Sequence, residues 1–151
     1  MITDERLNQV GKTEKVKSAT EIPDNLTEIL LKVLEFTQKR QKVLISNLRD
    51  FDKPGFLPTD LPCREFSDVL NIALNEQEKN NRLLFIDTNN IKFLGGGCFE
   101  SRPVPDNYAK YLLKISVERY HRYQVDKIIE NSLNQKFAAQ LLQQKGQLNT
   151  T

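Results

Sequence analysis

Residues 26–48 read LTEILLKVLEFTQKRQKVLISNL, and this stretch decides the fold class. Side chains suited to a helix–helix contact recur in it at alternating steps of four and three, at Leu30, Leu34, Thr37, Gln41, Leu44 and Leu48. Such a heptad repeat is the contact seam of a helix that pairs with another helix, and its polar positions favour specific pairing. We therefore expect residues 26–49 to be helical and to pair with a second helix.

That second helix is expected at residues 108–145, which contain neither glycine nor proline. A helix of this length would span about 55 Å, too long for a small compact globule. Apolar side chains recur at steps of four in its second half, at Ile129, Leu133, Phe137 and Leu141. The two apolar stripes predict a coiled-coil-like hairpin of two long terminal helices, packed antiparallel or nearly so.

The rest of the chain is expected to be mostly irregular. Residues 1–22 are polar and predict a flexible arm, after which Asp24 or Asn25 could cap the first helix. Residues 23–146 then form a single helical domain, and residues 147–151 follow Gly146 as a tail. The middle of that domain, 50–107, is expected to contain a short helix at 65–74, a glycine turn at 95–97, and little or no strand.

Composition supports an elongated helical protein. Apolar residues make up 38% of the chain, below the usual value of about 45–50%, and tryptophan is absent. Long helices need only one apolar stripe each, and a partner would have to cover any stripe left open. The 22 basic and 20 acidic residues nearly balance, which disfavours nucleic acid as a partner.

The residues that usually carry catalysis or bind metals are scarce and scattered. Cys63, Cys98 and His121 are separated by long stretches, whereas zinc sites usually contain a close pair of ligands. Gly11-Lys12-Thr13 resembles the end of a phosphate-binding loop, but Arg6 stands where the loop needs a second glycine. We therefore expect no catalytic site, no cofactor and no metal, and a protein that is not an enzyme.

Neither a cleaved signal nor a membrane span is predicted. Residues 1–6 lack an apolar core, and no run of about 18 apolar residues occurs anywhere in the chain. If the protein leaves the cytoplasm, we expect a route that does not read a cleaved signal peptide.

A motif after the first helix resembles the N-terminal signature of the bacterial flagellar basal-body rod protein family. That signature runs A-x-N-L-A-N-A-D-T-P-G-Y, and this chain reads SNLRDFDKPGF at residues 46–56. Five residues match, and a phenylalanine replaces the final tyrosine: Asn47, Leu48, Asp52, Pro54, Gly55 and Phe56. Arg49 to Phe51 and Lys53 depart from the pattern.

Four later segments also resemble the proximal rod proteins of this family, in the same order along the chain. They are Asp60–Leu61 with 65–70, then 87–95, 105–107, and 118–124. The resemblance implies a structural rod subunit whose terminal helices assemble into a helical tube that transmits torque for motility. It further implies type III export without signal cleavage, location in the rod that crosses the periplasm, and self-association. Other rod and basal-body subunits and the export gate would be its partners.

A different class of protein also fits the helical hairpin. A cytoplasmic adaptor or chaperone could use the same two helices to hold one protein partner. Location distinguishes the two hypotheses, because a rod subunit fractionates with basal bodies and an adaptor with the cytosol.

Overall fold

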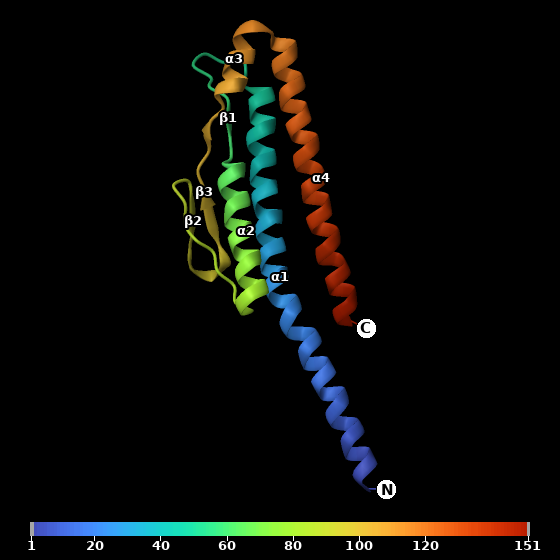
Figure 1. Ribbon diagram of the computed structural model, residues 1–151. Coiled ribbons are helices and arrows are strands. Elements are labelled where there is room, and N and C mark those ends of the chain that lie inside the picture. Colours follow the sequence, from blue (N-terminus) through green and yellow to red (C-terminus); the bar gives the residue numbers. More distant parts are fainter. Residues whose placement is uncertain (1, 151) are drawn as a thin grey trace.

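The computed structural model describes residues 2–150, with side chains described for residues 25–146. The chain is mainly α-helical with little strand, as the sequence predicts. Its elements, in order, are α1 (Ile2–Arg49), β1 (Thr59–Asp60), α2 (Cys63–Asn80), β2 (Ile91–Phe93), the 3₁₀ turn η1 (Gly95–Gly97), β3 (Phe99–Ser101), β4 (Val104–Pro105), α3 (Asn107–Ile115) and α4 (Val117–Thr150). Figure 1 shows an elongated molecule in which α1 and α4 run side by side.

The two long helices are antiparallel. Tyr120, near the start of α4, donates its hydroxyl hydrogen to the Asn47 carbonyl oxygen near the end of α1, at 2.8 Å. Further along α4, Asn131 Nδ2 donates to Thr37 O at 2.7 Å. Lys145 Nζ then lies 3.4 Å from Thr27 Oγ1. Partners therefore move backward along α1 as the chain moves forward along α4.

Helix α1 begins at Ile2 rather than at the predicted position near residue 26. The backbone of residues 2–22, predicted as a flexible polar arm, is helical and continues through Pro23, Asp24 and Asn25 without a cap. A proline inside a helix removes one hydrogen bond but does not by itself end the helix. The predicted C-terminal boundary is confirmed, since α1 ends at Arg49.

The second long helix differs from the prediction at both ends. Ser116 is extended and separates α3 from α4, so residues 108–145 do not form one helix. Its side-chain oxygen accepts a hydrogen bond from Arg119 N at 3.2 Å, and its carbonyl oxygen accepts one from Tyr120 N at 3.0 Å. Ser116 thus caps α4. At the other end, α4 continues through Gly146 to Thr150, where a tail was predicted, and Thr151 lies outside the described residues.

The middle segment covers one side of α1 (Figure 1). Its helix α2 is longer than the predicted 65–74 and ends at Asn80, followed by Asn81 as a C-cap with a left-handed backbone of φ 50°. Strands β2 and β3 pair antiparallel, with Lys92 opposite Glu100, and β1 pairs antiparallel with β4. The predicted glycine turn joins β2 to β3, with φ of 78° at Gly96.

The core consists of two clusters of buried side chains. One lies between α1, α2 and the β2–β3 hairpin and contains Phe36, Leu61, Phe66, Ile91 and Phe99. The other joins α3 to α4 and contains Ala109, Leu112 and Tyr120. The first cluster therefore packs α2 and the β2–β3 hairpin against α1, and the second packs α3 against α4.

The antiparallel register predicts which cysteine pairs can be cross-linked. Gln41 Nε2 donates to Ser132 Oγ at 3.1 Å on an exposed surface, so cysteines at these two positions should react with a short bifunctional thiol reagent. Cys63 and Cys98 would be replaced first. A Leu34/Leu133 cysteine pair serves as the control and should link poorly, because Leu133 lies on an exposed face of α4 that points away from α1. The yield of linked chain, measured by mass spectrometry, checks the register, and preferential linking of the control pair would contradict it.

Candidate assembly site

The motif after α1 folds into a β-turn. Phe56 N donates to Lys53 O at 3.1 Å, which closes a turn with Pro54 and Gly55 at its centre. Gly55 has φ of 76°, as the type II turn of a Pro-Gly pair requires. Beyond its two chain neighbours, no described residue comes within 4 Å of the position that a Cβ would take at Gly55. Glycine is therefore favoured here by the backbone conformation and not by a lack of space for a side chain.

Substitution of Gly55 should isolate this conformational demand. Gly55→Val should lower the free energy of unfolding by about 1–3 kcal/mol, because a β-branched residue is strained at positive φ. Gly55→Asn is the matched control, since asparagine tolerates the left-handed region. Urea denaturation of both variants checks the prediction, and equal losses for valine and asparagine would refute it.

Asn47 joins the end of α1 to two other elements. Its Nδ2 donates to Thr59 O at 2.7 Å and to Gln124 Oε1 at 3.2 Å, and its Oδ1 lies 3.4 Å from Thr59 N. Its carbonyl oxygen accepts the hydrogen bond from Tyr120. Asn47 is only 2% exposed, and its bonds to Gln124 and Tyr120 are buried. This residue fixes the position of β1 and of α4 relative to the turn.

Some of the remaining motif residues pack against the core, and the others are exposed to solvent. Phe56 packs against the cluster of Ala109, Leu112 and Tyr120, and Leu48 is half-buried. Asp52, Pro54 and Gly55 are exposed on the turn. The structure therefore brings Asn47 and Phe56 into the core and leaves the tip of the turn accessible.

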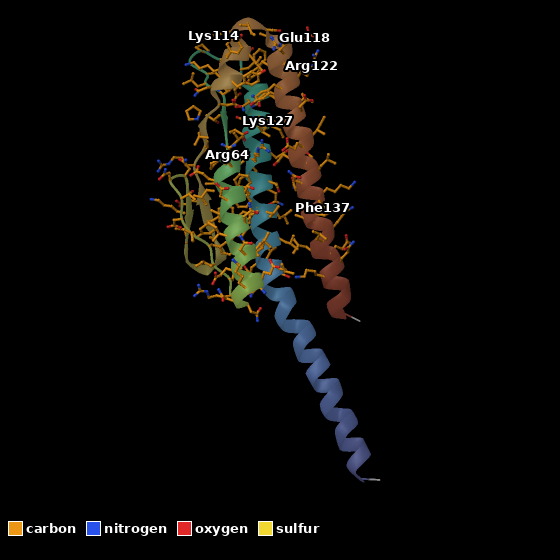
Figure 2. The ribbon with its side chains drawn as sticks, viewed as in Figure 1. Arg64, Lys114, Glu118, Arg122, Lys127 and Phe137 are labelled. Carbon is orange, nitrogen blue, oxygen red and sulfur yellow. The ribbon has the colours of Figure 1, made fainter. Side chains whose placement is uncertain are left out.

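A buried network of charges lies beside the motif, and no pattern in the sequence indicates it. Arg40 donates from Nε and from one terminal nitrogen to the two carboxylate oxygens of Asp60, at 2.9 and 3.0 Å. Lys127 Nζ bridges Asp60 Oδ2 at 2.9 Å and Asp106 Oδ2 at 2.8 Å. Tyr123 donates its hydroxyl hydrogen to Asp106 Oδ2 at 3.1 Å. Figure 2 shows Lys127 between α1 and α4.

The network changes the pKa values of Asp60 and Lys127. Burial alone would raise the pKa of Asp60, but hydrogen bonds from Arg40 and Lys127 hold that pKa below its usual value. Burial alone would lower the pKa of Lys127, but its bonds to Asp106, Tyr123 and Asp60 raise that pKa instead. Each charge is therefore stabilised by its neighbours. Asp106 also caps α3 by accepting from Ala109 N at 3.0 Å, which ties that helix to the network.

The face of α4 that contacts α1 is polar at two of its four buried positions. Its buried residues follow steps of four, seven and seven, at Tyr120, Gln124, Asn131 and Ala138. The predicted stripe points elsewhere: Ile129, Leu133 and Phe137 are 54%, 62% and 63% exposed. The predicted face of α4 is therefore wrong within the single chain. Apolar periodicity could not reveal the contact face, because two of its four buried residues are Gln124 and Asn131.

The predicted seam of α1 agrees better with the structure. Leu44 is fully buried, and Leu30 and Leu34 are half-buried. Leu141, the last residue of the predicted stripe, is half-buried. Only part of the predicted apolar contact therefore exists within one chain.

An open groove lies between α1, α2 and α4, with a volume of about 750 Å³. Mainly apolar side chains line it, among them Leu30, Val33, Leu70, Leu74, Phe137 and Leu141. Phe137 belongs both to this groove and to the exposed stripe, so the two form one apolar surface. A helix with an apolar face could dock there.

The residues considered for chemistry remain apart. Cys63 is half-buried and burial raises its pKa to about 11, whereas Cys98 is exposed. The ring of His121 packs edge-on against Phe51, with 4.6 Å between ring centroids. Within the described part of the chain, no group of three or more metal-binding side chains comes together.

Comparison with family models, with curated proteins and with solved structures finds no match for this chain. No helix of the described residues is long and apolar enough to cross a membrane.

Proposed function

We propose that the chain is a non-enzymatic structural subunit of the bacterial flagellar basal-body rod. One observation carries this proposal: segments that resemble the rod family, although distant in sequence, converge in space. Asn47 of the first segment bonds to Tyr120 and Gln124 of the last one. Asp60 and Asp106, from two other segments, share Lys127. Four of the five matched segments thus contribute residues to one contact region where α1, β1 and α4 meet.

The surface of the hairpin supports assembly as its mode of action. The stripe of Ile129, Leu133 and Phe137 is exposed and continues into the apolar groove. Large exposed apolar surfaces on a single chain mark sites of interaction. In this proposal, one subunit covers the stripe of the next through contacts that do not close, which generates a helical tube.

The proposed location and partners follow from that role. The subunit is exported by the flagellar type III apparatus without cleavage of a signal and joins the rod that crosses the periplasm. There it contacts copies of itself, other rod and basal-body subunits, and the export gate. The assembled tube conducts exported subunits and transmits torque.

The second candidate is a cytoplasmic adaptor or chaperone that binds one protein partner. The groove between α1, α2 and α4 favours it, because an apolar groove of this kind accepts one amphipathic helix. In this role the chain remains in the cytosol, and motility does not depend on it.

An in-frame deletion of the gene tests the proposed function. We expect loss of swimming in soft agar and basal bodies without a rod in electron micrographs, with both restored by the wild-type gene. The tagged protein should fractionate with basal bodies. Normal motility of the deletion strain would overturn the rod proposal, and a cytosolic protein with intact motility would favour the adaptor.

A further inference from the structure

The end of the molecule formed by α3 and the start of α4, residues 107–122, has an unusual surface; we refer to it as the α3 tip. It lies at the opposite end of the molecule from both chain termini (Figure 1). Four large apolar or aromatic side chains are exposed there: Tyr108, Tyr111, Ile115 and Val117, at 51%, 55%, 47% and 44%. Three of them follow steps of three and four along α3, so they lie on one face of the helix. Ala109 and Leu112 form the other face and are buried.

The α3 tip is also positively charged. Residues 107–122 contain Lys110, Lys114, Arg119 and Arg122 against the single acidic residue Glu118, so the formal charge is four minus one, or +3. Glu118 is paired with Arg122 at 3.2 Å. The other three cations are exposed and make no side-chain ion pair or hydrogen bond with any described residue. Figure 2 shows Lys114, Glu118 and Arg122 at this end of the molecule.

We propose that the α3 tip binds the surface of an anionic lipid bilayer. Tyrosine and isoleucine side chains can enter the boundary between headgroups and acyl chains, while the lysines that flank them reach anionic headgroups. The exposed face of α3 has this composition. The proposal goes beyond the proposed function and does not depend on it.

The surface fits a lipid bilayer better than a protein partner. Stable protein interfaces bury about 1,600 Å² in total and lose charged residues from their centre. Here Lys110 and Lys114 flank the exposed apolar residues of α3, as on a helix that rests in the bilayer interface. Charge complementarity supplies the remaining attraction, because each cation near an anionic membrane strengthens binding by about fivefold.

Vesicle co-sedimentation of the full chain tests the proposal. We expect binding to vesicles of equal parts phosphatidylserine and phosphatidylcholine, weakening as salt rises, and little binding to phosphatidylcholine alone. The triple variant Lys110→Gln, Lys114→Gln, Arg119→Gln should bind about a hundredfold more weakly. Tyr111→Ser with Ile115→Ser should reduce binding at least about tenfold. All five positions are exposed, so the fold should persist, as far-UV circular dichroism can confirm.

A matched triple variant controls for net charge. Lys92→Gln, Arg102→Gln and Lys136→Gln removes three exposed cations outside the tip, and it should bind like the wild type. Equal losses in both triple variants, equal binding to both vesicle types, or no binding to either would overturn the proposal. Binding of the tip to an RNA oligonucleotide or to another protein, with no vesicle binding, would also overturn it.

Discussion

Replacement of Lys127 by methionine is expected to lower the free energy of unfolding by about 3–5 kcal/mol, because it leaves a buried carboxylate pair without its shared cation. The side chains of Asp60 and Asp106 are only 12% and 9% exposed. Arg40 would still neutralise Asp60, but Asp106 would keep only the hydroxyl of Tyr123 and its bond to Ala109. Urea denaturation followed by circular dichroism measures the loss.

Arg122→Met provides the control for Lys127→Met. Arg122 pairs with Glu118 at 3.2 Å, but the two side chains are 68% and 83% exposed. Exposed pairs of this kind contribute little, so the loss should be at most about 0.5 kcal/mol. If the two variants lose similar free energies of unfolding, burial of the Lys127 network does not account for its contribution to stability.

The same network predicts how stability depends on pH. The pKa of Asp60 is lowered in the folded state, so its contribution is present above an unfolded value of about 4 and disappears as pH falls through the folded pKa. The pKa of Lys127 is raised, so its contribution is present below about 10 and disappears as pH rises through the folded pKa. Unfolding free energies measured across pH should therefore fall at both extremes. In Lys127→Met, the part of the fall in unfolding free energy at alkaline pH that comes from deprotonation of Lys127 should be absent.

Serine substitution of Ile129, Leu133 and Phe137 together is expected to abolish assembly and leave the single chain folded. All three are more than half exposed, so the unfolding free energy should change by no more than about 1 kcal/mol. If the stripe is the contact between subunits, its loss removes the apolar area that stabilises that contact. We expect no swimming in soft agar and no rods in isolated basal bodies, although the variant accumulates normally.

Leu57→Ser provides the matched control for the stripe. Leu57 is 61% exposed, close to the 62% of Leu133, but it lies in the segment between the motif turn and β1. It should leave swimming and assembly intact. Normal swimming of the stripe variant would show that the stripe is not an assembly surface. Equal swimming and assembly defects in the stripe variant and in Leu57→Ser would show that assembly does not depend specifically on the stripe.

Local patterns in the sequence predicted those features that depend on neighbouring residues. The heptad repeat of 26–48 predicted a helix, and α1 contains all of these residues and ends at Arg49. A Pro-Gly pair such as Pro54-Gly55 favours a type II turn with positive φ at the glycine, and Gly55 has φ of 76°. The glycine turn at 95–97 also lies where it was predicted. Each depends on hydrogen bonds and backbone preferences that span a few residues.

The break at Ser116 and the buried face of α4 depended on residues far away in the chain. Nothing local forbids a continuous helix through Ser116, but the break lets Ala109 and Leu112 pack with Tyr120. Burial of Asn131 is acceptable because Thr37 and Gln41, 94 and 90 residues away, supply oxygens that accept its hydrogen bonds. Apolar periodicity alone chose Ile129 and Leu133, since a polar side chain shows no sign in the sequence of the partner that will satisfy it. The long-range hydrogen bonds therefore selected the face of α4 that meets α1 and left the apolar stripe on the outside.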